Sequence, residues 1–209
     1  MTRRIDVLRS LFRSAASGAR GGLQRLVPMD ALRRFSVDLR NRRVLIPASR
    51  LGAGLAHAPG VRSVALLPAA GRLRVDATLD DGEPLQVSIT PSAIRFAPRG
   101  AKEIVFQIAP ADRAGHRGVA DLVSALAGLI AHDLYRPALG GPEPLDPSGA
   151  ILDREGADRL RVDLRTVPAV RAARGSAAMT ILVEVMQVQS LRVEPDGLRL
   201  EIALPHIPM

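Results

Sequence analysis

Residues 72–90 read RLRVDATLDDGEPLQVSIT, and this stretch sets the fold class of the chain. Apolar side chains occupy every second position on both sides of the central turn, and polar side chains fall between them. Successive residues of a strand point to opposite faces, so this alternation predicts two strands with one buried and one solvent-facing side. The intervening Asp80, Asp81 and Gly82 supply turn chemistry. The stretch therefore predicts an antiparallel pair of half-buried strands.

The same alternation continues on both sides of this pair. Turn-forming residues at 68–71, 91–92 and 98–100 separate the apolar runs between Val61 and Ala109. Short connections of this kind disfavour parallel crossovers, so the segment predicts an antiparallel meander of about five strands. Further strands are expected at 160–164, 180–193 and 198–204.

Residues 118–135 predict a helix that other elements surround almost completely. Apolar residues cover more than half of its circumference, which is typical of a buried helix rather than a surface one. Its apolar run, residues 122–131, is far shorter than the roughly 20 residues that a membrane-spanning helix needs. We therefore expect the central core helix of an α+β protein.

The two flanks of this helix repeat one another. The sequence RFSVDLR at 34–40 matches RLRVDLR at 159–165, and the same offset of 125 residues carries strand 73–79 onto 198–204. Each copy continues into a segment of small residues with expected helix, at 48–58 and 168–178. A repeat this long indicates two related halves of one fold rather than a solenoid. We predict an internal duplication with halves at about 34–79 and 159–204.

The net charge of the chain lies in its first 43 residues. They carry 11 arginines against three acids, whereas the remaining residues are balanced. Apolar and basic residues alternate at helical spacing from about Arg3 to Ala16, so we expect a basic amphipathic arm over residues 1–28, followed by one β-rich domain over 29–209. Such a helix can dock on an anionic membrane. The residues expected to dock are Arg3, Arg4, Leu8, Arg9, Phe12, Arg13 and Arg20.

Known catalytic and metal-binding patterns are not present in the sequence. The chain has no cysteine, and its four histidines lack the spacing of a zinc motif. No Gly-x-Ser-x-Gly elbow occurs, and the glycine-rich run at 18–22 lacks the preceding strand and the Lys-Ser/Thr of a nucleotide-binding loop. We expect no catalytic residue, cofactor or metal. An enzyme would need a pocket that gathers His116, His132 and nearby acids.

Nucleic acid is disfavoured as a partner despite the basic arm. The chain has only five aromatic residues, and none lies among arginines on a polar strand face, where bases could stack. Non-specific binding of duplex phosphates by the arm alone is the remaining route.

The order of elements resembles a known family. The segments VLIPASRL at 44–51, PGVRSV at 59–64 and GRLRVDA at 71–77, followed by the long meander, are similar to bacterial LmeA-like proteins and to the tubular lipid-binding (TULIP) superfamily over about residues 30–204. This resemblance implies a long, curved antiparallel sheet wrapped around a helix, with an apolar groove for lipid acyl chains. On the apolar faces, the residues expected to contact lipid are Leu122, Leu126, Leu129, Ile130, Val75, Val87, Phe96 and Phe106.

These patterns favour a non-enzymatic lipid-binding or membrane-associated protein of bacterial origin. Arginines interrupt every apolar run near the N-terminus that could act as a secretory signal, so we expect a cytoplasmic protein at the inner face of the membrane. The alternative is a structural or adaptor module, as a homo-oligomer or with a protein partner, whose basic helix docks on that partner. In that case the apolar faces form an ordinary filled core.

Overall fold

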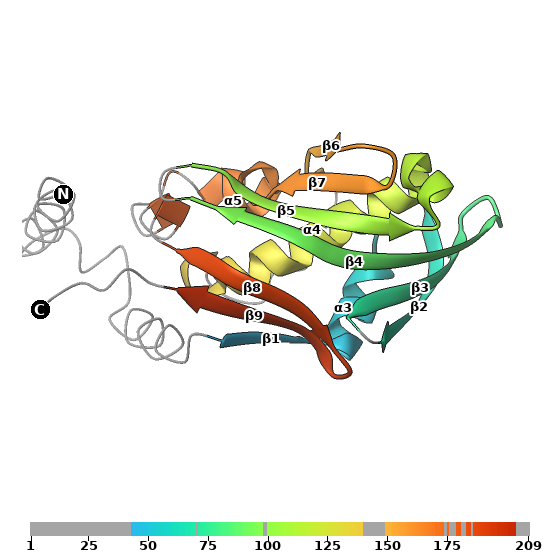
Figure 1. Cartoon of the computed structure of the whole chain (residues 1–209), viewed down its shortest axis with the longest axis horizontal. Helices are drawn as coiled ribbons and strands as arrows, with labels where there is room; N and C mark the ends of the chain where they lie inside the picture. Colours follow the sequence, from blue (N-terminus) through green and yellow to red (C-terminus); the bar gives the residue numbers. More distant parts are fainter. Residues whose placement is uncertain are drawn as a thin grey trace, which may run out of the picture. The chain divides into compact units, whose positions relative to one another are not determined.

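The computed structural model describes residues 43–203, apart from residues 70, 98–99, 140–148, 174, 176–178, 181–182 and 185. The described residues belong to one compact unit and form two antiparallel sheets with helices (Figure 1). This confirms the α+β class and its large antiparallel sheet. The predicted arm, its membrane-docking residues and the first repeat segment at 34–40 lie outside the described residues.

The larger sheet has six strands and contains the hairpin predicted from residues 72–90. Strand β3 buries Leu73, Val75, Ala77 and Leu79, whereas the residues between them lie at or near the surface. All neighbouring strands are antiparallel. In spatial order the strands are β2 (Val61–Ala69), β3 (Arg72–Leu79), β4 (Pro84–Phe96), β5 (Lys102–Ala109), β7 (Arg159–Asp163) and β6 (Leu152–Arg154).

The smaller sheet joins the two ends of the described chain. Its strands are β1 (Arg43–Pro47), β9 (Gly197–Ala203) and β8 (Gln187–Glu194), in that order. Strand β8 contacts β4 of the larger sheet, and Figure 1 shows the two strands side by side. The strands are thus divided between two adjacent sheets, whereas the sequence suggested one long sheet.

The segment from Val61 to Ala109 contains four strands instead of the five expected. The expected turn at Pro91 and Ser92 lies inside β4, where the pairing with β5 shifts by one residue. Ser92 is the extra residue, and its hydroxyl donates to the carbonyl of Val105 (3.1 Å). Pairing of β4 with β3 ends at Ile89, so Pro91 has a ladder partner on one side only. A strand tolerates proline at such a bulge.

Two other strands differ from expectation. Strand β8 begins at Gln187 rather than near Thr180. Met179 and Val183, both buried and four residues apart, lie in helical conformation, so the apolar residues here follow a helical spacing and not a strand spacing. The short edge strand β6 was not expected, because three residues are too few to show an alternation.

The helices agree with the sequence pattern in position. The small-residue segments form α3 (Ala48–Leu55) and α5 (Pro168–Ala173), each shorter than expected. Two 3-10 turns, η2 (Ala111–Gly115) and η3 (Leu164–Thr166), precede α4 and follow β7.

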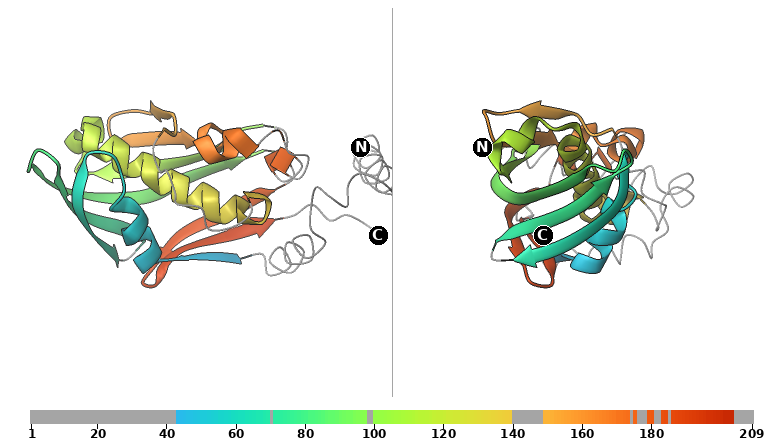
Figure 2. Two further views of the ribbon diagram at one scale, coloured as in Figure 1. Left: turned by 180° about the vertical axis from the view of Figure 1, so that it is seen from behind. Right: turned by 90° about the vertical axis from the view of Figure 1, so that its right-hand side faces the viewer.

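The expected central helix is α4 (Arg117–Leu139), which extends beyond its predicted end. Every residue from Leu122 to His132 is buried. Helix α4 contacts α3, α5 and strands of both sheets, namely β1, β4 and β7, and the left view of Figure 2 shows it in yellow across the sheets. The stretch from Arg117 to Tyr135 is long and apolar enough to span a membrane, but 83% of it is buried inside the protein. Such burial is typical of a core helix.

Two hairpins occupy corresponding positions in the predicted halves. Hairpin β2–β3 closes with the pair Ala69–Arg72, and hairpin β8–β9 closes with Glu194–Gly197, 125 residues later. The first strand of the first half lies outside the described residues, so the duplication stays a prediction.

Candidate functional site

The interior around α4 contains nearly all of the residues expected to contact lipid. The four helix residues are fully buried, and Val75, Val87 and Phe106 are at most 3% exposed. Phe96, at the end of β4, is half-buried. The structure therefore brings seven of the eight side chains into the interior. Burial at these positions is equally required of an ordinary core.

The interior also contains the only lysine of the chain. Lys102 is 1% exposed, because it is the first residue of β5 on the face that carries Ile104, Phe106 and Ile108. Sequence reasoning did not single out this residue. The signal was present, since the two-residue period of β5 places Lys102 on the apolar face.

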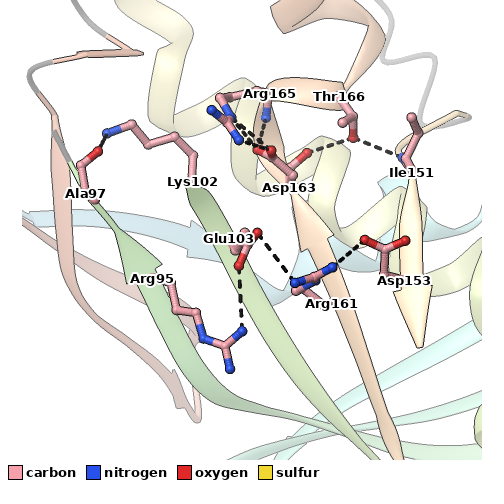
Figure 3. Close-up of polar contacts among 10 residues, drawn as sticks. All are labelled: Arg95, Ala97, Lys102, Glu103, Ile151, Asp153, Arg161, Asp163, Arg165 and Thr166. Atoms are coloured by element: carbon pink, nitrogen blue, oxygen red, sulfur yellow. Dashed lines mark hydrogen bonds and ion pairs between the residues drawn. The ribbon is translucent and has the colours of Figure 1, made fainter. Parts of the chain in front are cut away.

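Lys102 connects the two sheets. Its ammonium donates hydrogen bonds to the carbonyl of Ala97, just after β4 (2.7 Å), and to that of Met186, just before β8 (3.3 Å). The ammonium also lies 5.6 Å from the centre of the Phe96 ring. Figure 3 shows the extended side chain of Lys102 reaching Ala97. A compact ammonium can donate to separate carbonyls, whereas arginine presents a rigid planar fork.

The electrostatic surroundings disfavour the charged form of Lys102. Burial lowers its pKa below the ordinary value of 10.5, and the guanidinium of Arg165 acts in the same direction. The carboxylates of Glu184 and Asp163 oppose this shift. The carbonyl oxygens that accept the two hydrogen bonds also stabilise the ammonium, because a buried charge needs polar partners.

Arg165 is held in turn by Asp163 at the end of β7. Arg165 donates to the Asp163 carboxylate through its backbone amide (3.0 Å) and through its Nε (2.9 Å). This hydrogen bonding raises the pKa of Arg165, so the guanidinium stays charged near Lys102. Thr166 Oγ1 donates to the Asp163 carbonyl (2.7 Å) and accepts from the amide of Ile151 (3.0 Å), as Figure 3 shows.

The outer face of the same strands carries a ladder of charged residues. Arg95 on β4, Glu103 on β5, Arg161 on β7 and Asp153 on β6 alternate in sign across four strands (Figure 3). The successive nitrogen–oxygen distances are 3.7, 3.8 and 2.7 Å. The two arginines and Asp153 are at least 36% exposed and Glu103 is half-buried at 17%, and pairs that water reaches in this way contribute little individually. The ladder leaves this face without a large excess of either charge.

The histidines considered for an enzyme lie far apart. His116 accepts from the amide of Gly118 (3.1 Å) and lies 3.3 Å from a carboxylate oxygen of Glu83. His132 Nδ1 accepts from the guanidinium of Arg50 (3.2 Å). The two histidines are separated by about 24 Å along α4, at 1.5 Å per residue. No single pocket therefore gathers both.

His132 belongs to a polar contact between two helices. Arg50 on α3 lies 2.9 Å from the carboxylate of Asp133, next to His132 on α4. Within the described part of the chain, no three histidine, aspartate or glutamate side chains are grouped as ligands for a metal ion.

No family model, curated protein or solved structure matched this chain. The functional proposal therefore rests on the residues and geometry described above.

Proposed function

We propose that this protein is a non-enzymatic lipid-binding or membrane-associated protein. Its two sheets wrap around α4 and hold an apolar ligand, and its basic N-terminal arm docks on anionic membrane at the cytoplasmic face. The observation that carries the proposal is the placement of α4, a helix that is apolar on most sides and that contacts strands of both sheets.

The composition of the interior supports this proposal. The inner faces of β3, β4 and β5 carry aliphatic and aromatic side chains, and the buried residues of α4 are almost all aliphatic. An acyl chain gains about 0.8 kcal/mol for each buried methylene group, so an interior of this kind can hold lipid without a polar contact. The ligand would lie between α4 and the strands, in contact with Leu126, Val87 and Phe106.

Lys102 supports the interior indirectly. Its hydrogen bonds join the end of β4 to the start of β8, at the place where the larger and smaller sheets meet. We assign it a positioning role, because it holds together the adjoining edges of the two sheets that α4 contacts.

The sequence of the arm supports membrane association. Residues 1–26 contain six arginines and one aspartate. Each basic residue near an anionic leaflet contributes about 1 kcal/mol, so the electrostatic part of binding is at most about 5 kcal/mol. The apolar face of the helix adds to this attraction.

A structural or adaptor role is the second candidate. The observation that favours it is the nearly complete burial of the expected lipid contacts by the chain's own residues, as in a filled core. In this case the basic arm docks on a protein partner or on a second copy of the chain.

Native mass spectrometry after mild purification separates the two candidates. The lipid-binding proposal predicts protein ions with additional lipid mass, and lipid in a solvent extract of the same sample. Detection of the protein only at the mass of the polypeptide would contradict the proposal that its interior holds lipid.

A matched pair of variants shows where the lipid binds. Val87→Phe adds volume to the interior and should lower the fraction of lipid-bound protein, because Val87 is 3% exposed on the inner face. Ser88→Phe adds the same ring on the opposite face of β4 and should leave that fraction unchanged. Circular dichroism checks that both variants fold. Equal lipid retention in the two variants would place the lipid outside this interior.

A further inference from the structure

The tip of hairpin β2–β3 combines exposed apolar and basic side chains. Leu67 is 54% exposed, and its cross-strand neighbour is Arg74. Ala69 and Arg72, the last pair before the turn and two residues further along the hairpin, are both exposed. These four residues, together with Gly71, are called the β2–β3 tip. They place an apolar surface next to two guanidinium groups.

The β2–β3 tip differs in charge from the β3–β4 and β8–β9 turns, and it shares its lack of acids with the β4–β5 turn, whose residues 97–101 read APRGA. The β3–β4 turn contains Asp80 and Asp81, and the β8–β9 turn contains Asp196. Residues 67–72, in contrast, read LPAAGR and contain no acid. Among the described atoms, none beyond the adjoining residues lies within 4 Å of the position that a Cβ on Gly71 would take, so Gly71 faces open space.

The arginines of the tip are available to a ligand. In the part of the chain that the structure describes, Arg72 forms no ion pair. Arg74 Nε lies 3.6 Å from Asp76 Oδ1, too far for a hydrogen bond, and the Arg74 side chain is 57% exposed, so this pair holds the guanidinium weakly.

Two other large apolar side chains of the described residues, Leu45 and Ile151, are about as exposed as Leu67, but the charged residues near them differ from those near Leu67. Leu45, 44% exposed, lies opposite Arg199, whose guanidinium is bound by Glu194 (2.7 Å). Ile151, 56% exposed, lies beside β6, which is the edge of the six-stranded sheet opposite to β2 (Figure 1), and Asp153 follows closely. Among the described residues, the β2–β3 tip is therefore the place where an exposed leucine adjoins arginines that no carboxylate holds by a hydrogen bond.

We propose that the β2–β3 tip is a second membrane-docking element, in addition to the N-terminal arm. Leu67 and Ala69 enter the interfacial region of an anionic bilayer, while Arg72 and Arg74 contact lipid phosphates. This pairing of a shallow apolar insertion with basic residues is how peripheral proteins bind anionic membranes. The inference rests on the proposed membrane association, and it adds a contact from the folded body to that of the arm. Two weak contacts in one chain reinforce each other through effective concentration.

The absence of tryptophan from the sequence permits a direct test in the full chain. Leu67→Trp places a single fluorophore at the β2–β3 tip, and Ile151→Trp places one at a similarly exposed position on the opposite sheet edge. Each variant is mixed with vesicles of phosphatidylcholine and phosphatidylglycerol, with and without brominated acyl chains. We expect the emission of the Leu67→Trp protein to shift to shorter wavelength and to be quenched by the brominated lipid. The emission of the Ile151→Trp protein should change little.

Co-sedimentation of the same samples separates the two proposals. If the Leu67→Trp protein pellets with anionic vesicles while its emission stays unchanged, the tip does not dock, and the arm alone accounts for binding. If neither variant pellets and neither emission changes, membrane association fails, and the tip proposal fails with it.

Charge reversal provides an independent test. Arg72→Glu combined with Arg74→Glu should weaken binding to anionic vesicles by about tenfold or more, since each arginine near the surface adds severalfold to the affinity. The control combines Arg117→Glu with Arg171→Glu, which changes net charge equally at exposed positions on α4 and α5. Equal loss in both double variants would assign the effect to net charge and would overturn the tip proposal.

Discussion

Lys102 and Glu103 are consecutive residues of β5 with opposite environments. Lys102 is buried on the inner face, where two backbone carbonyls accept its hydrogen bonds. Glu103 lies on the outer face between Arg95 and Arg161. A buried polar group is costly unless it is satisfied, whereas exposed charges are solvated with or without a partner. The inner face should therefore determine stability, and the outer face should tolerate change.

The largest difference in the stability cost of a substitution is expected between two neighbouring residues at the centre of β5. Phe106→Ala removes a fully buried ring and should lower the free energy of unfolding by about 3–5 kcal/mol. Gln107→Ala, on the exposed face, removes one exposed hydrogen bond to Asp158 (2.9 Å) and should lower it by about 1 kcal/mol or less. Urea denaturation followed by circular dichroism measures both values. Comparable losses of stability in the two variants would show that the two faces of β5 do not differ in burial in solution.

Lys102→Ala should have the next largest effect. It leaves the Met186 carbonyl without its lysine donor and removes the packed side-chain stem, so we expect a loss of about 2–3 kcal/mol. The Ala97 carbonyl keeps a second hydrogen bond, from the amide of Gly100 (3.0 Å). The same denaturation experiment applies, and a loss below about 0.5 kcal/mol would contradict the bridging role.

The pH dependence of stability tests the environment of Lys102 more finely. The folded pKa is lowered below 10.5, so between these two values the unfolded chain binds more protons than the folded one. The stability of the wild type relative to Lys102→Met should therefore rise with pH through this window, by at most about 1.4 kcal/mol per pH unit. Denaturation of both proteins from neutral to alkaline pH measures the difference. If the stability of the wild type relative to Lys102→Met falls with pH instead, the pKa of Lys102 is raised on folding and not lowered.

The smallest effect is expected on the outer face. Glu103→Gln breaks the charged ladder between Arg95 and Arg161 and should cost less than about 1 kcal/mol. The cost should shrink at high salt, because salt screens exposed charges. Denaturation at low and high salt checks this. A larger cost that is independent of salt would mean that the half-buried Glu103 carboxylate, 17% exposed, behaves as a member of a buried ion pair and not of an exposed one.

The features that follow from local periodicity could be predicted from the sequence. Alternation identified the hairpin of β3 and β4, and helical spacing identified α4. The continuity of β4 through Pro91 could not be predicted in this way, because Pro-Ser is a normal turn signal and only the bulge opposite β5 accommodates it. The same applies to the division into two sheets, which depends on pairing between distant strands.

The site was predictable to a similar extent. The inner positions of α4, β3, β4 and β5 followed from the pattern of apolar residues, and seven of the eight expected contacts are buried. The bond from Lys102 to Met186 spans 84 residues and depends on where β8 meets β4. The exposure of Leu67 was also not apparent, because β2 has apolar residues on both faces and alternation alone does not distinguish them.

The measurement that tests the proposed function most directly is co-sedimentation with lipid vesicles. The full chain and a chain that begins at Leu26 are compared on anionic and on neutral vesicles. We predict that the full chain pellets with anionic vesicles, that added salt releases it, and that the shortened chain binds more weakly. A full chain that stays in the supernatant with both kinds of vesicle would contradict membrane association.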